Sequence, residues 1–267
     1  MSLSIKKSGQ SVQITNSGGQ LCGSYHYENM FKSFFRGLYT PSGKDVVACP
    51  PPEHLHHKGL MFGLTTSAAN FWEEDEFSEP DDNKLPIGKQ TTTAVELLPQ
   101  SEGIGFTQTI VWETDMEGIF NETRKISVTE EPGSYVWNWQ TTLIALRDVQ
   151  ITRSVWGVPG YCSQQFGYCG LGIRLASDLF QNGEVLPAGT TCGSTPTCIF
   201  FRGDGVQVKF DHDAKQANAL FVSTYQSGGP YPGGPGFAYL CLVPRPPRDL
   251  KQGTTLECNY IITVSDV

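Results

Sequence analysis

The sequence contains no long hydrophobic run. No window approaches the roughly 20 consecutive apolar residues that a transmembrane helix needs. The amino-terminal segment Met1–Lys7 has neither the apolar stretch nor the small-residue cleavage site of a signal peptide. We therefore expect a soluble, cytoplasmic protein without membrane contacts. A periplasmic location would require that a signal peptide had been removed.

Stretches rich in lysine and arginine are also missing. The chain has 19 Lys and Arg against 27 Asp and Glu, which gives a formal net charge of −8. No basic stripe is present that could neutralise a row of phosphates. This argues against nucleic acid and anionic membranes as partners and leaves a small molecule as the expected ligand. The oligomeric state cannot be read from the sequence.

Paired metal-binding cysteines and nucleotide-binding loops are absent as well. The eight cysteines are scattered without a Cys-x-x-Cys pair, which argues against a thiolate zinc site. We interpret them as buried thiols in a reducing cytoplasm, with a Cys192–Cys198 or Cys162–Cys169 bridge as the alternative. No glycine-rich loop opens a helix and no Gly-x-Ser-x-Gly occurs, so nucleotide binding and an α/β-hydrolase triad have no support.

What the sequence does contain is alternation of apolar and polar residues. It is clearest in Gly103–Glu113, Phe120–Thr129 and Tyr135–Leu146, and a Pro-Gly turn at Glu130–Ser134 separates the last two. These runs predict an antiparallel meander of long strands. Further strands are expected at Ser11–Thr15 and Leu21–Tyr27 (a hairpin around Asn16–Gly19), Val206–Asp211, Ala219–Thr224, Phe237–Val243 and Thr255–Val264.

Many strands and few helices indicate an all-β, antiparallel β sandwich. Neither an internal repeat nor a linker divides the chain, so we expect residues 1–267 to form one domain.

Three of the five histidines, His54, His56 and His57, lie within Pro50–Gly59. Imidazole is the side chain best suited to proton transfer near neutral pH, so we predict these three as catalytic residues lining a polar cleft. In an extended segment His54 and His56 would share one face. The alternatives are a surface turn that is rich in histidine by chance, or a histidine hydrogen-bonded in the core.

No cofactor is evident, and a divalent metal is a further alternative. His-x-His on a strand binds metal when a remote ligand completes the site, and His212 is the distal histidine available.

Several other residues are candidates for the same cleft. We predict Lys32, Lys58, Trp72 and Arg174 as substrate-binding residues, with Arg36 a further cation near the cleft. The other flat aromatic faces are those of Tyr39, Trp156 and Tyr225. The base nearest in the chain is Glu53, Glu73 or Glu74. The last two begin the acidic run Phe71–Asn83, which is typical of an exposed loop.

Four segments resemble the bacterial family labelled methane oxygenase PmoA-like. They are Leu38–Gly43 (Leu-Tyr-Thr-Pro-Ser-Gly), His54–Gly63 (His-Leu-His-His-Lys-Gly-Leu-Met-Phe-Gly), Asn70–Trp72 and Phe166–Arg174. The chain departs from the family pattern at Asp211–Asp213, where no proline follows the histidine. The membrane copper enzyme in the family label does not fit a chain without transmembrane helices.

The resemblance instead implies a β supersandwich similar to galactose mutarotases, acting in sugar catabolism. We therefore expect acid/base chemistry on an aldose or on a keto-sugar or glycoside, by an epimerase, lyase or hydrolase. The alternative is a non-catalytic carbohydrate-binding or assembly module on the same sandwich.

Overall fold

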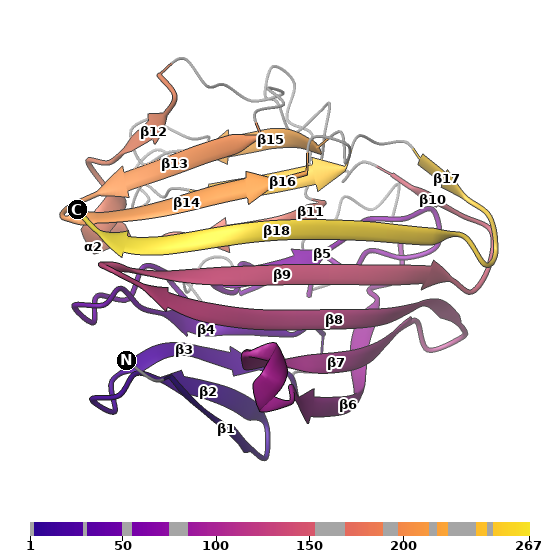
Figure 1. The fold of residues 1–267 in the computed structure, drawn as a ribbon. Helices are drawn as coiled ribbons and strands as arrows, with labels where there is room; N and C mark the ends of the chain where they lie inside the picture. The colour runs from indigo at the N-terminus through magenta and orange to yellow at the C-terminus, as the bar shows by residue number, and fades with distance from the viewer. Residues whose placement is uncertain are drawn as a thin grey trace.

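We describe the protein from a computed structural model, which covers residues 3–28, 31–49, 55–74, 85–152, 169–188, 197–213, 218–223, 239–244 and 248–267. Two antiparallel sheets of eight strands each dominate these residues. The short strands β10 (Val149–Ile151) and β17 (Arg248–Leu250) form a third, two-stranded sheet. Figure 1 shows the two large sheets lying one behind the other. In this part of the chain, no helix is long and apolar enough to cross a membrane.

The first sheet has the strand order β1-β2-β3-β4-β5-β11-β16-β15, and all its pairs are antiparallel. Its strands are β1 (Ser4–Ser8), β2 (Ser11–Thr15), β3 (Leu21–His26), β4 (Phe34–Leu38), β5 (Leu60–Gly63), β11 (Gly170–Arg174), β16 (Tyr239–Pro244) and β15 (Asn218–Ser223). Strands that lie far apart in the sequence, such as β5 and β11, are therefore neighbours at its centre.

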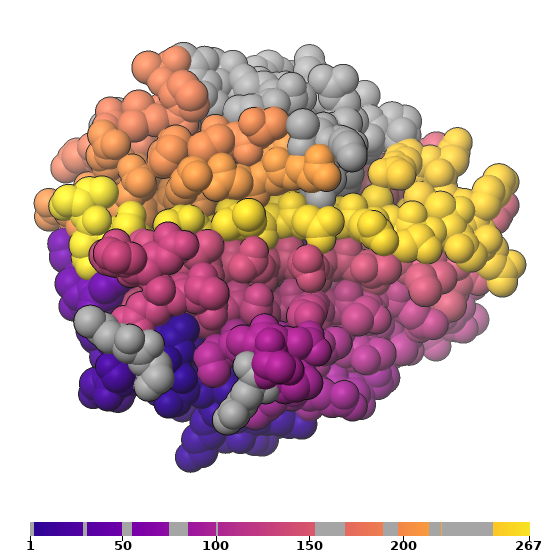
Figure 2. All heavy atoms as spheres, viewed as in Figure 1, coloured from indigo at the N-terminus to yellow at the C-terminus, as the bar shows by residue number. Residues whose placement is uncertain are grey.

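The second sheet has the order β12-β13-β14-β18-β9-β8-β7-β6, again antiparallel throughout. Its strands are β12 (Glu184–Leu186), β13 (Cys198–Gly203), β14 (Val206–His212), β18 (Thr255–Asp266), β9 (Ser134–Ala145), β8 (Gly118–Glu131), β7 (Ile104–Glu113) and β6 (Lys89–Leu97). The described helices are short, η3 (Gln100–Glu102) and α2 (Ser177–Phe180). Figures 1 and 2 face this sheet, with β18 a yellow band between β14 and β9.

The predicted antiparallel sandwich is confirmed, most closely where the sequence alternates. Strands β7, β8 and β9 form the expected meander, and the turn between Glu131 and Ser134 holds Gly133 at a φ of 75°. The inward positions are apolar as expected, with Phe106 and Ile110 fully buried on β7. The hairpin of β2 and β3 is confirmed as well.

Four strands of the first sheet were not predicted, namely β1 at its edge and β4, β5 and β11 near its centre. Every residue of β5 and β11 is buried, and only Arg36 is exposed on β4. A strand that is buried on both faces has no polar side to alternate with, so its sequence carries no period of two. Strands β4, β5 and β11 nevertheless position the candidate site described below.

The core lies between the two large sheets and is rich in aromatic contacts. Phe35 of the first sheet meets Trp137 of the second edge to face, with ring centroids 4.9 Å apart. Phe62 meets Trp112 in the same manner at 6.0 Å. Pairs of this geometry add about 0.5–1.5 kcal/mol beyond the area they bury.

A charged pair also lies in this core. Arg124 and Glu122, both on β8, are fully buried and joined by two hydrogen bonds, Nε to Oε1 at 2.7 Å and Nη2 to Oε2 at 2.9 Å. Trp112 donates to Glu122, and Arg124 donates to the hydroxyl of Tyr25 on the first sheet. The polar network therefore connects the two sheets through the apolar core.

The five described cysteines are free thiols, and three of them, Cys22, Cys169 and Cys258, are buried as interpreted, whereas Cys49 and Cys198 are partly exposed. Cys198 is a free thiol, so the alternative Cys192–Cys198 bridge is not formed. Burial raises the pKa of Cys258 and of Cys169 to about 12. Since the thiolate is the reactive form, both are inert near neutral pH.

Candidate functional site

The candidate site lies on the outer face of the first sheet, around β4, β5 and β11. Phe35 packs against Trp137 and so points between the sheets. Its neighbour Phe34 therefore points to the opposite side. There the ring of Phe34 contacts the imidazole of His26 and lies 5.4 Å from Nζ of Lys58. The outer face of the sheet thus brings His26 of β3 and Lys58 of the segment before β5 to the same ring.

The described part of the histidine segment begins in a turn at residues 55 and 56, so it does not have the extended geometry considered for it. Residues 55–59 turn into β5, and Gly59 has a φ of 51°. A Cβ atom at Gly59 would lie 2.0 Å from the carbonyl oxygen of Phe35, so only glycine fits between the segment and β4. The rings of His56 and His57 meet edge to face at 4.3 Å. The third predicted histidine, His54, lies outside the described residues.

His56 is paired with a buried carboxylate. Its Nδ1 atom lies 3.3 Å from Oε2 of Glu73, whose side chain is 2% exposed, whereas the imidazole of His56 is 17% exposed. The ring therefore has one edge held from within the protein and remains accessible from outside. A carboxylate in that position fixes the orientation of an imidazole and stabilises its protonated form.

The burial of Glu73 overturns part of one prediction. The acidic run Phe71–Asn83 was expected to be exposed, but residues 71–74 are buried or nearly so, and 75–83 lie outside the described residues. The side-chain oxygen of Asn70 accepts hydrogen bonds from the backbone N–H groups of Trp72 and Glu73, which turns the chain inward. Cations that are distant in sequence then neutralise the carboxylates.

Two lysines supply that positive charge. Lys58 lies 2.6 Å and Lys32 lies 3.3 Å from the carboxylate of Glu74. Lys32 is fully buried and also donates to the carbonyl groups of His56 and Trp72. Burial lowers the pKa of Lys32, and the carboxylates of Glu74 and Glu73 oppose that shift. Lys32 thus connects the turn that contains His56 to the segment Trp72–Glu74.

Arg174 and Trp72 are buried next to His57, the neighbour of His56. Nη1 of Arg174, at the end of β11, lies 3.3 Å from Nδ1 of His57, and both side chains are buried. The ring of Trp72 is fully buried and 6.4 Å from that of His57. The substrate contacts predicted for Lys32, Trp72 and Arg174 stay predictions, and the structure shows all three side chains buried.

Among the described residues, no group of three or more His, Cys, Asp or Glu side chains could hold a metal ion. His212, the proposed remote ligand, lies on β14 of the second sheet, where it pairs with Tyr260. Glu73, the carboxylate beside His56, gives an arrangement that suits proton transfer.

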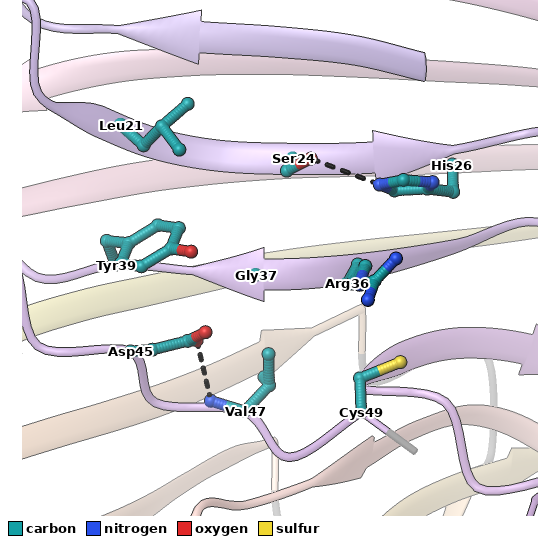
Figure 3. A pocket seen from close by; sticks show the side chains of 9 residues that line it. All are labelled: Leu21, Ser24, His26, Arg36, Gly37, Tyr39, Asp45, Val47 and Cys49. Atoms are coloured by element: carbon teal, nitrogen blue, oxygen red, sulfur yellow. Dashed lines mark hydrogen bonds between the residues drawn. The ribbon is translucent and has the colours of Figure 1, made fainter. Parts of the chain in front are cut away.

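A pocket of about 450 Å³ lies beside this cluster, over β3 and β4. Figure 3 shows Ser24 and His26 on β3, Arg36 and Gly37 on β4, and Tyr39, Asp45 and Cys49 on the segment that follows. The volume lies in the range of small-molecule sites, about 300–1,000 Å³. Of its polar residues, the sequence had singled out Arg36 and Tyr39. Trp156 and Tyr225, also considered as ligand contacts, lie outside the described residues.

Comparison with known proteins gives a family but no activity. No curated protein matches the chain. Two solved structures of heparan sulfate lyase HepC from Pedobacter heparinus, one of them a mutant, align with 96% of the chain at 7% identity and a TM-score of 0.38. The chain covers 33% of those structures. A family model described as "Family of unknown function (DUF6807)" matches residues 11–267, and the chain therefore belongs to that family.

Proposed function

We propose that the protein is a carbohydrate-active enzyme that uses His56 as its general acid or base. The observation that carries the proposal is the His56–Glu73 pair, in which a partly exposed imidazole is held by a buried carboxylate. General acid/base catalysis needs a group that reaches the substrate and is kept in one orientation. His56 meets the first condition through its exposure, and Glu73 meets the second.

Two features support a sugar as the substrate class. The adjoining pocket is lined by hydrogen-bonding side chains, which suits a ligand covered with hydroxyl groups. The resemblance of segments such as His54–Gly63 to the PmoA-like family, which implies a mutarotase-like sandwich acting on sugars, points in the same direction. In this proposal, His56 exchanges a proton with a ring or glycosidic oxygen, or with a carbon made acidic by a neighbouring carbonyl.

The other charged residues have different roles in this proposal. Glu73 is a positioning residue that acts through His56. Lys58, with a side chain 12% exposed, can donate to a substrate oxygen. The fully buried Lys32 holds the turn in place, as its contacts with the carbonyl groups of His56 and Trp72 indicate.

The test is a panel of aldoses, keto-sugars and glycosides, followed by proton NMR. We expect at least one to be converted, and Glu73→Gln to lower kcat about 10–100-fold with little change in KM, since an orienting group acts on the reacting imidazole. Glu73→Asp, which keeps the charge, should recover part of the rate. The matched control is Glu102→Gln, which removes an exposed carboxylate paired with Lys125.

Two results would reject this function. One is binding of panel sugars without conversion, which would favour the alternative of a binding module. The other is a Glu73→Gln variant with wild-type kcat and an unchanged melting temperature.

A further inference from the structure

We propose that the pocket over β3 and β4 binds the carboxylate of an acidic sugar, so that the substrate carries a uronic acid unit. The inference rests on the proposed function for the identity of the reaction. Binding in the pocket can be measured independently of it. Three features point to this ligand: Arg36, the opposite chemistry of the two ends of the pocket, and Phe34, which connects the pocket to the cluster around His56.

Arg36 occupies a β-bulge. In the pairing of β3 with β4, Tyr25 faces Phe35 and Ser24 faces Gly37, so Arg36 has no opposite residue. Bulges redirect a side chain and occur frequently beside binding sites. The side chain of Arg36 is exposed and lines the pocket. Among the described residues, it forms no ion pair, in contrast to Lys32 and Lys58. Its planar guanidinium matches a carboxylate in a bidentate manner.

The rest of this end of the pocket supplies hydrogen bonds without a second positive charge. His26 lies near Arg36, and its ring nitrogen Nε2 is 3.3 Å from the hydroxyl of Ser24. Burial and the charge of Arg36 both lower the pKa of His26. The imidazole is therefore neutral at pH 7 and can hydrogen-bond to a ligand oxygen.

The other end of the pocket suits hydroxyl groups. Figure 3 shows Tyr39 and Asp45 there, across Gly37 from Arg36. Asp45 is held by the backbone N–H groups of Leu38 and Val47, at 3.1 and 3.2 Å from its Oδ1. A Cβ atom at Gly37 would lie 2.6 Å from the Tyr39 hydroxyl, so glycine makes room for that ring.

The two ends together favour one ligand orientation. A carboxylate is attracted to Arg36 and repelled by Asp45, whereas sugar hydroxyls can donate to Asp45 and to the Tyr39 oxygen. A uronic acid carries both kinds of group on one ring. A neutral sugar would leave Arg36 without a partner, and inorganic sulfate would leave the hydroxyl-binding end unused.

Phe34 connects this pocket to the acid/base pair. The His26 ring stacks on Phe34 with centroids 5.8 Å apart, and Nζ of Lys58 lies 5.4 Å from the same ring. Lys58 in turn pairs with Glu74, which is adjacent in sequence to Glu73. A sugar held at Arg36 therefore lies beside the cluster that contains His56.

The experiment is isothermal titration of the full chain with D-glucuronate, D-glucose and inorganic sulfate. We expect D-glucuronate to bind most tightly. Arg36→Gln should weaken its binding about 10–100-fold, since a charge-assisted contact is lost, and Arg36→Lys should restore part of it. The control is Arg202→Gln, which removes an exposed arginine of β13 in the second sheet. Melting curves should be unchanged, because Arg36 is exposed.

Three results would overturn the inference: wild-type binding by Arg36→Gln, equal binding of D-glucose, or equal binding of sulfate. His56→Gln separates this failure from that of the proposed function. If His56→Gln keeps full turnover while Arg36→Gln loses D-glucuronate, the acid/base proposal fails and the pocket assignment stands. If His56→Gln loses turnover while Arg36→Gln binds normally, only the pocket assignment fails.

Discussion

Replacing His56 with glutamine is expected to lower turnover of the panel substrate by about 10²–10⁴-fold, the usual contribution of a general acid or base. Stability should change by about 1 kcal/mol or less, because the side chain is partly exposed and glutamine can still donate to Glu73. Substrate binding should be retained. The measurements are initial rates by NMR, titration calorimetry and thermal melting of the same preparation.

His57 provides the internal comparison. It is 3% exposed and contacts Arg174, so His57→Gln should cost about 1–3 kcal/mol of stability by disturbing a buried polar contact. The two substitutions should therefore have different effects: His56→Gln lowers the turnover rate, and His57→Gln lowers the stability. Full turnover in His56→Gln, or a stability loss at His56 as large as that at His57, would contradict the assignment.

The largest loss of stability is expected from the buried pair on β8. Glu122→Gln keeps the shape of the side chain but leaves the guanidinium of Arg124 without its counter-charge in the core. Breaking a buried ion pair on one side costs about 3–5 kcal/mol. For a chain of this size each kcal/mol lowers the melting temperature by about 2–4 °C. Calorimetric melting measures the effect.

The control for this prediction is Glu102→Gln, which removes one half of the Lys125–Glu102 pair. Both side chains of that pair are exposed, so the change should cost at most about 1 kcal/mol. The double variant Glu122→Gln/Arg124→Met, which removes both charges, should recover part of the stability that Glu122→Gln loses. Equal losses from Glu122→Gln and Glu102→Gln would show that the buried pair is not a structural element.

The alternation that predicted β8 also contained this pair. Phe120, Ile126 and Val128 are buried on the inward face, and the period of two places Glu122 and Arg124 on that same face. Two opposite charges at inward positions, separated by one residue, indicate a buried ion pair. The sequence therefore indicated the ion pair between Glu122 and Arg124. The aromatic residues of the other sheet that contact this pair could not be deduced from the sequence.

The candidate site was predictable in part. The clustering of histidines pointed to His56 and His57, and Glu73 was one of three candidate carboxylates, but its place in an acidic run predicted exposure instead of burial. Its burial depends on Lys32 and Lys58, which only the folded chain brings to Glu74. Those contacts cannot be deduced from the distribution of charge along the sequence.

The pocket was even less predictable from the sequence than the histidine cluster. Arg36 was noted as a cation near the cleft, but its exposure there results from a bulge in the pairing of β3 with β4. Neither the register of two strands nor the packing of the Tyr39 ring against Gly37 can be deduced from residue types. The residues that determine the proposed specificity are therefore those that the sequence indicated least.

We propose above that a sugar binds and reacts on the outer face of the first sheet, beside His56. The most direct test is NMR of the imidazole groups in histidine-labelled protein, titrated with the sugar of the panel that is converted fastest. We expect the signals of His56 and His26 to shift on saturation, and that of His212, on β14 of the second sheet, to stay in place. Unchanged His56 and His26 signals at saturation, or a shift confined to His212, would contradict the account.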